Sequence, residues 1–241
     1  MEARAYEVIP FEVISGKKEK KPYVPVKDCT ARPVKDREQL EVVKEKLLYS
    51  SKKYGYRNYA IFLLGINCGL RCGDVLQIRL KDIWDEGRKE ITGLTVIEEK
   101  TKKTRRNIRF SETVREGLRD YVLTLKDRTP DMPLFPSQKK NVQKVKETVK
   151  DNKGCLAVKS YWRIMHEISL ATGIEHLSTH SMRKTFGYEV YTKNAGRLIA
   201  NEYRAIDVVQ QMLNHNSVSD TLRYIGITEE VQNEVYAGMQ L

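Results

Sequence analysis

The chain has 241 residues, 40% of them hydrophobic, which is enough to bury the core of one large domain. Its formal net charge of +11 favours a polyanionic partner, most often nucleic acid. The four cysteines fit neither a zinc-site spacing nor a small disulfide scaffold, and no apolar stretch is long enough to span a bilayer, so these classes are excluded and a reduced, cytoplasmic setting is expected.

Residues 1–35 differ in composition from the rest of the chain. They are rich in lysine and hold four of the seven prolines, a pattern that predicts an extended basic arm or linker without a packed core. Such an arm either lies along DNA phosphates or is a solvated leader. Residues 36–241 carry periodic hydrophobic patterns and are predicted to form one folded domain.

Helical periodicity begins at Asp36, which is predicted to cap the first helix with Gln39 at the reciprocal position. A second helix is predicted over 56–67, ended by Gly69, and a short third helix over 74–78. A β-branched run over 91–97 and a returning strand over 107–110 predict a hairpin with a basic turn.

Helical patterns dominate the remainder. Ser111 is predicted to cap the next helix, and the lysine-rich residues 137–153 to form a solvated insert. Gly173 is predicted to end a helix over 157–172, and further helices are expected over 180–192, 205–213 and 229–237. The fold class predicted is α+β, mainly α-helical with a small antiparallel β-hairpin.

Three blocks carry side chains that suit phosphodiester chemistry. CGLRCGDVLQI contains Arg71, THSMRKTF contains His180 and Arg183, and LNHNSVSDTLRYIGI contains His215 and Tyr224. Guanidinium groups bind two phosphate oxygens at once, imidazole moves protons near neutral pH, and a phenol can attack phosphorus. The set is sufficient to move a phosphodiester onto a tyrosine without a metal ion.

Each residue also has an ordinary structural role to offer. Arg71 could pair with Asp74, His180 could cap a helix, and Tyr224 could be one of 13 tyrosines that pack at a helix end. His176 and His180 have the spacing of a zinc helix, but Leu177 stands where a metalloprotease needs glutamate and no third ligand is evident. We therefore expect no metal site and no cofactor.

From Asp36 to the C-terminus the order and spacing of these blocks resemble the tyrosine recombinases, the phage integrase family. The resemblance implies the catalytic-domain fold of that family, with Arg71 and Arg183 as a clamp on the scissile phosphate and Tyr224 as the nucleophile. It implies that His215 donates a hydrogen bond to the phosphate.

For His180 the resemblance implies one of two roles, a proton acceptor from the tyrosine or a donor to the phosphate. It also implies a hairpin lysine that protonates the leaving 5′ oxygen. Lys100 matches the usual placing, with Lys103 as the runner-up and Lys102 as another rival. The arginines and a nearby lysine are expected to favour the phenolate of the nucleophile.

The activity implied is that of a site-specific recombinase or integrase that works through a 3′-phosphotyrosyl link and needs neither metal nor ATP. The partners implied are double-stranded DNA, three further copies of the chain in a homotetramer on two duplexes, and a helper DNA-bending protein, with the enzyme at the nucleoid. The last helix would pack either on a neighbouring protomer or on its own core.

One departure from the family concerns length. About 35 residues precede the predicted domain, too few for the usual helical core-binding domain, so we expect a catalytic-domain-only recombinase or a fragment of a longer integrase. The alternatives are a non-catalytic DNA-binding regulator on the same fold and a type IB-like topoisomerase.

Overall fold

The computed structural model describes residues 31–97, 104–137 and 154–239, and the predicted Lys100, Lys102 and Lys103 lie outside these ranges. In the described part the helices are α1 (Arg37–Tyr49), α2 (Gly55–Cys68), α3 (Cys72–Leu76), α4 (Glu112–Leu123), α5 (Val158–Thr172), α6 (Thr179–Asn194), α7 (Ala205–Met212), α8 (Val218–Ile225) and α9 (Ile227–Gly238). The strands are β1 (Trp84–Asp85), β2 (Glu90–Ile91), β3 (Leu94–Ile97), β4 (Thr104–Ile108), β5 (Leu198–Ile199) and β6 (Tyr203–Arg204).

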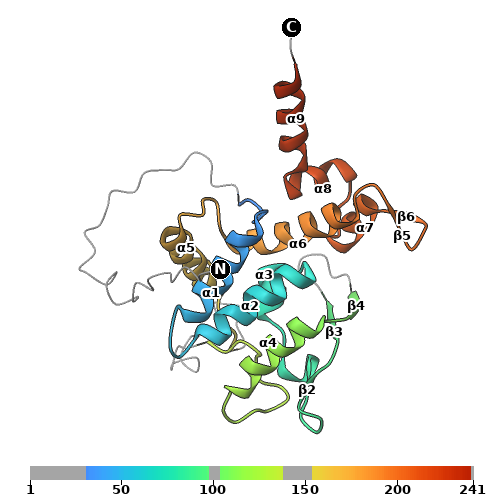
Figure 1. The fold of residues 1–241 in the computed structure, drawn as a ribbon. Helices are drawn as coiled ribbons and strands as arrows, with labels where there is room; N and C mark the ends of the chain where they lie inside the picture. The colour runs from blue at the N-terminus through green and yellow to red at the C-terminus, as the bar shows by residue number, and fades with distance from the viewer. Residues whose placement is uncertain (1–30, 98–103, 138–153, 240–241) are drawn as a thin grey trace, which may run out of the picture. The chain divides into compact units, whose positions relative to one another are not determined.

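Helix α2 lies at the centre of the main core and packs against α1, α4 and α6 (Figure 1). Its central run from Ala60 to Leu64 is buried on every side, which explains why this helix is apolar around its whole circumference. At Gly65 a Cβ would lie 2.7 Å from the sulfur of Met182, so the missing side chain lets α6 approach α2 closely.

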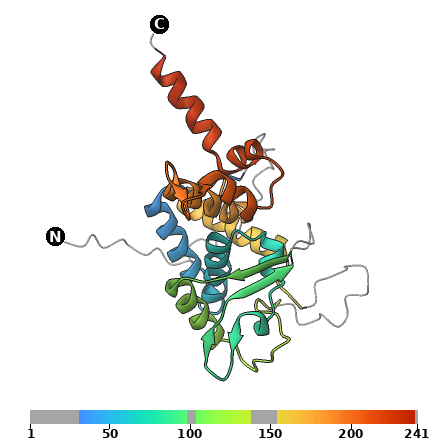
Figure 2. The same cartoon turned by 90° about the vertical axis from the view of Figure 1, so that its right-hand side faces the viewer.

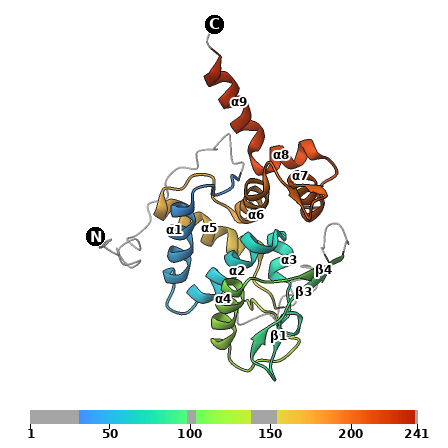
Figure 3. The ribbon, with the colours of Figure 1, turned by 45° about the vertical axis from the view of Figure 1, so that its right-hand side comes forward.

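The strands form antiparallel pairs of β1 with β2, β3 with β4 and β5 with β6 in the described part of the chain. The β1–β2 pair and the β3–β4 pair lie towards α4, whereas the β5–β6 pair lies beside α7 (Figures 1 and 3). The predicted strand over 91–97 is divided at Thr92 and Gly93, and the returning strand begins three residues earlier than predicted, at Thr104. The fold is mainly helical with small antiparallel sheets, as predicted.

A second, smaller core lies between α6, α7, α8 and α9 and buries Phe186, Val209, Leu213 and Ile225. Helix α8 was not predicted, although it carries Tyr224. Helix α9 follows α8 and extends away from the other helices in both views (Figures 1 and 2).

The predicted helix ends are largely correct. Asp36 accepts a hydrogen bond from the Gln39 N–H at 2.9 Å, and Gly69 and Gly173 end α2 and α5 in the left-handed conformation. Ser111 occupies the N-cap of α4, but its side chain makes no cap hydrogen bond. Among the described helices, none is long and apolar enough to cross a membrane.

Candidate active site

Arg183 is a buried cation that connects the three motif blocks. It lies on α6 with 2% of its surface exposed, and its Nη1 donates a hydrogen bond to the Gly69 carbonyl at 2.5 Å. Its Nη2 donates to the Leu213 carbonyl. Because Gly69 precedes Arg71 by two residues and Leu213 precedes His215 by two, one guanidinium holds both neighbouring blocks against α6.

Gly69 is required at the turn between α2 and α3 for two reasons. Its φ of 61° lies in the left-handed region, and a Cβ would lie 2.3 Å from the ring of Phe186. The chain then enters α3 with Arg71, a half-buried residue, at the N-cap in an extended conformation. The sharp turn thus brings Arg71 to the side of the domain where Arg183 lies.

Tyr224 lies on α8 among residues from the other blocks. Its ring meets the His215 ring edge to face at a centroid distance of 4.9 Å, and Lys184 Nζ lies 5.0 Å from its centroid on the α6 side. The pKa of its phenol responds to the charges of Arg71 and Arg183 and to a hydrogen bond with Arg183. The structure therefore brings together four of the predicted residues, Arg71, Arg183, His215 and Tyr224.

The net shift of the Tyr224 phenol differs from the expectation. Burial raises its pKa above the ordinary value of 10.0 and outweighs the lowering by Arg183 and Arg71. The arginines act in the predicted direction, but the removal of the phenol from water dominates in the DNA-free chain. The phenol is therefore protonated at neutral pH and must lose its proton during any attack on phosphorus.

The two histidines have different environments. His180 is exposed in the first turn of α6, one helical turn before Arg183, and its N–H donates to the side chain of the N-cap Ser178 at 3.3 Å. His215 is half-buried between α7 and α8, and its Nδ1 lies 3.2 Å from Thr221 Oγ1. Contact with Thr221 orients the His215 ring, while His180 lies at an open edge where a ligand can reach it.

Asn214 has a left-handed backbone conformation between two residues of the candidate site. It stands between the Leu213 carbonyl bound by Arg183 and His215, with a φ of 48°. Asparagine adopts this left-handed conformation more readily than other residues with a side chain. Its buried side-chain NH₂ finds no acceptor among the described residues.

Sequence reasoning missed Lys184, Thr221 and Asn214. The only signal for Lys184 was its place directly after Arg183, and Thr221 lay in a helix that was not predicted. Lys100, the predicted general acid, lies outside the described residues. Within residues 31–97, 104–137 and 154–239, no three His, Cys, Asp or Glu side chains gather as a metal ion would require.

Comparisons with known proteins show which family the chain resembles. Residues 36–230 match the Phage integrase family. The probable integrase/recombinase YoeC of Bacillus subtilis is 33% identical over 205 residues, which cover 85% of this chain and 94% of that protein. Tyrosine recombinase XerC of Treponema denticola is 29% identical over 185 residues, covering 75% of this chain and 55% of that protein.

Solved structures share the fold. The XerH site-specific recombinase bound to its difH substrate has a TM-score of 0.58 at 18% identity, over 88% of this chain and 54% of that one. The XerA recombinase has a TM-score of 0.56 at 22% identity, over 90% of this chain and 68% of that one. The chain thus spans about half the length of XerC and XerH but nearly all of YoeC. It belongs, as its motifs predict, to the phage integrase family of site-specific tyrosine recombinases.

Proposed function

We propose that this chain cleaves and rejoins DNA with Tyr224 as the nucleophile. The phenol oxygen attacks the scissile phosphorus, the bond to the 5′ oxygen breaks, and a 3′-phosphotyrosyl link forms. A 5′ hydroxyl from a second duplex then reverses the step, so the bond energy is kept in the covalent link. The observation that carries the proposal is the convergence of Arg71, Arg183 and His215 on Tyr224.

Two arginines would stabilise the charge that builds up on the non-bridging oxygens as phosphorus becomes five-coordinate. Arg183 is suited to this role because its hydrogen bonds to two carbonyls fix the guanidinium before substrate arrives. Arg71, at the half-buried N-cap of α3, supplies the second guanidinium. His215 would donate to the same phosphate, oriented by its contact with Thr221.

The raised pKa of Tyr224 supports a role for a proton acceptor. A phenol that burial keeps protonated gains from a base positioned at the moment of attack, an effect of about 10²–10⁴-fold. His180 is the predicted acceptor and lies one turn before Arg183 on α6. At the leaving group, Lys100 is proposed to donate a proton to the 5′ oxygen, with Lys103 as the runner-up.

Covalent capture tests the nucleophile. The target site is obtained by incubating the tagged protein with sheared genomic DNA of the organism that carries the gene, and sequencing the fragments that survive SDS. A duplex with a nick beside that site should then trap an adduct with the wild type and none with Tyr224→Phe. Adduct formation by Tyr224→Phe would overturn the assignment.

The leaving-group acid has its own test. Lys100→Ala should slow cleavage of the ordinary duplex, and a 5′-bridging phosphorothioate should restore the rate because a thiolate leaves without an acid. Rescue of Lys103→Ala instead would assign the role to Lys103. Adducts without strand exchange between duplexes would favour a topoisomerase, which the comparisons do not favour.

The assembly we propose is a homotetramer on two duplexes, in which α9 packs on a neighbouring protomer. Val231 and Tyr236 on this helix are 52% and 72% exposed.

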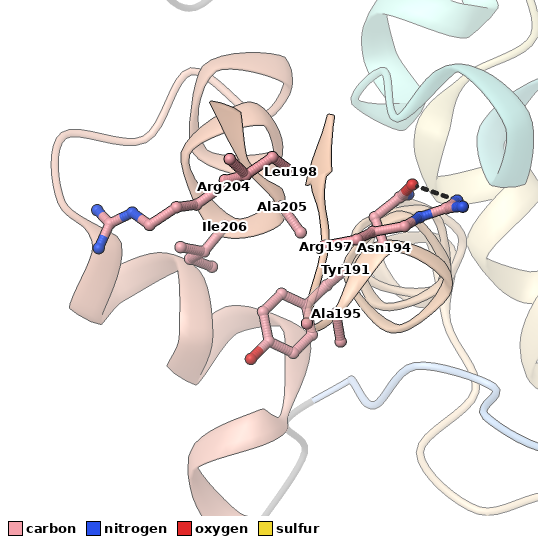
Figure 4. Close-up of a pocket in the computed structure, with 9 residues that line it drawn as sticks. Tyr191, Asn194, Ala195, Arg197, Leu198, Arg204, Ala205 and Ile206 are labelled. Carbon is pink, nitrogen blue, oxygen red and sulfur yellow. Dashed lines mark hydrogen bonds between the residues drawn. The ribbon is translucent and has the colours of Figure 1, made fainter. Parts of the chain in front are cut away.

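A cavity of about 290 Å³, lined mostly by apolar groups, lies between the end of α6, the β5–β6 hairpin and α7 (Figure 4). Its lining includes Tyr191 and Ile206, and Arg197 turns to Asn194 with a hydrogen bond of 2.7 Å.

The size of the complex on DNA tests this assembly. Light scattering of the protein with two site-bearing duplexes should give four chains, and truncation after residue 226 should leave at most single chains on each site. A tetramer formed by the truncated chain would contradict the role of α9. The predicted basic arm of residues 1–35, before a catalytic domain of residues 36–241, is proposed to reach DNA phosphates through its first 30 residues, because Val34 is buried against α6. A helper DNA-bending protein and a nucleoid location belong to the same proposal.

A further inference from the structure

The segment just before α1 crosses the elements that carry the active site. The Arg32 N–H donates to the His176 carbonyl at 3.1 Å, ahead of α6. Two residues later, the Val34 N–H donates to Thr185 Oγ1 on α6 at 2.8 Å, and Val34 itself is 4% exposed. Residues 31–35, which we call the strap, are thus held by one hydrogen bond to the segment before α6 and by a buried hydrogen bond to α6 itself.

Lys35 ends the strap at the joint between α8 and α9. Its Nζ donates to the Gly226 carbonyl at 3.2 Å and lies 5.1 Å from the centroid of the Tyr188 ring on α6. Gly226, with a φ of 78°, is both the C-cap of α8 and the N-cap of α9. A cation at the C-terminal end of a helix is favourable because the last carbonyls carry partial negative charge.

Tyr224, Ile225 and Gly226 each have a contact on α6, which for Gly226 runs through Lys35. Lys184 lies on the ring of Tyr224, and Gly187 lets Ile225 approach so closely that a Cβ there would lie 2.7 Å from its Cγ2. Lys35 and Tyr188 complete the series at Gly226. Since α6 also carries Arg183, these contacts between α6 and the end of α8 set the distance between the Tyr224 phenol and the Arg183 guanidinium.

We propose, on the basis of the function proposed above, that Lys35 is a positioning residue for the nucleophile. By holding the Gly226 carbonyl against Tyr188, it fixes the end of α8 two residues beyond Tyr224. Phosphoryl transfer needs the phenol oxygen in line with the leaving 5′ oxygen, and a displacement of about 1 Å can cost about 10²-fold in rate. Lys35 acts on the reaction through the backbone of α8 and not through contact with the phosphate.

Single-turnover cleavage of the nicked duplex, at saturating DNA and fixed salt, tests the role. Lys35→Met should cleave about 10-fold more slowly with an unchanged Kd for DNA, and Lys35→Arg, which keeps a donor for Gly226, should restore most of the rate. Lys193→Met is the matched control, because Lys193 lies on α6 with its side chain 57% exposed and paired to Glu189. It should cleave at the wild-type rate.

Three results would overturn the inference. In all three, Lys35→Met cleaves saturating DNA at the wild-type rate. In the first nothing else is altered, and in the second the Kd for DNA is weaker, which would make Lys35 a phosphate contact. In the third the Tm is lower, which would make Lys35 only structural. A second readout does not need cleavage. The ¹⁹F resonance of 3-fluorotyrosine at position 224 should shift or broaden in Lys35→Met and not in Lys193→Met.

An unchanged ¹⁹F resonance in Lys35→Met would refute the inference even if the wild type formed no covalent adduct. The absence of an adduct with the wild type would refute the proposed function instead. The two failures are therefore distinguishable.

Discussion

Replacement of Arg183 by methionine isolates the hydrogen bonds that hold the site together. Methionine fills a similar volume but cannot donate to the carbonyls of Gly69 and Leu213, both of which Arg183 binds in a buried environment. A buried group left without its partner costs about 1–3 kcal/mol, so two carbonyls give a loss of about 2–6 kcal/mol. In a chain of this size each kcal/mol lowers Tm by about 2–4 °C.

Urea unfolding followed by circular dichroism measures this free energy, with Arg115→Met as the matched control. Arg115 lies on the exposed face of α4, paired with Glu112 one turn away. Exposed pairs of this kind contribute little, so the control should change stability by no more than about 0.5 kcal/mol. Both variants lose one positive charge, which leaves the buried hydrogen bonds as the difference.

A wild-type midpoint for Arg183→Met would refute the reasoning. It would mean that water or neighbouring donors satisfy the Gly69 and Leu213 carbonyls without the guanidinium. Cleavage should be lost in Arg183→Met in any case, because the proposed clamp on the phosphate loses one half. Stability, and not activity, therefore decides whether Arg183 has the structural role that its contacts indicate, beside the catalytic role proposed for it.

The remaining predictions concern α8 and its surroundings. Gly187→Ala should lower the free energy of unfolding by about 1–3 kcal/mol and slow cleavage, because the new Cβ would collide with Ile225; urea unfolding and the nicked duplex measure both effects. Asn214→Gly should raise stability by about 0.5–1 kcal/mol in the same unfolding assay, because glycine suits a φ of 48° and removes a buried amide without an acceptor among the described residues. Burial raises the pKa of Tyr224, so its neutral form stabilises the fold below pH 10 and this contribution is lost as pH rises through the folded value. Between pH 9 and pH 11 the wild type should therefore lose more stability than Tyr224→Phe.

Each of these predictions has a control or a contrary outcome. Gly238→Ala adds the same methyl group at a helical position with nothing within 4 Å, and should not destabilise the chain. A less stable Asn214→Gly would show that the asparagine amide has a partner that matters. An equal loss of stability between pH 9 and pH 11 in the wild type and in Tyr224→Phe would show that burial does not control the titration of this phenol.

The helical framework was predictable because its elements are long and strongly patterned. The ends of α1, α2 and α5 carry a capping aspartate or a left-handed glycine, which local chemistry dictates. Helix α8 was missed although Val218, Leu222 and Ile225 have the spacing of one helix face, and although it is as long as α7, which was predicted. The break between β2 and β3 falls at Thr92 and Gly93, where a glycine interrupts the β-branched run; the prediction treated the run as one strand.

The site was predictable as a set of residues but not as a network. The order of the blocks around Arg71, Arg183 and Tyr224 was visible in the sequence. That Arg183 binds two backbone carbonyls was not, because every residue has a carbonyl and none marks an acceptor in the sequence. The raised pKa of Tyr224 was equally hidden, since burial depends on the packing of α8 against α6.

The placement of Arg183 has a consequence for protein synthesis. Its two carbonyl partners lie 114 residues before it and 30 residues after it in the chain. A nascent chain that has not yet released Leu213 and Tyr224 from the ribosome lacks both the second anchor of Arg183 and the proposed nucleophile. The residues of the candidate site can therefore come together only after α8 has been synthesised.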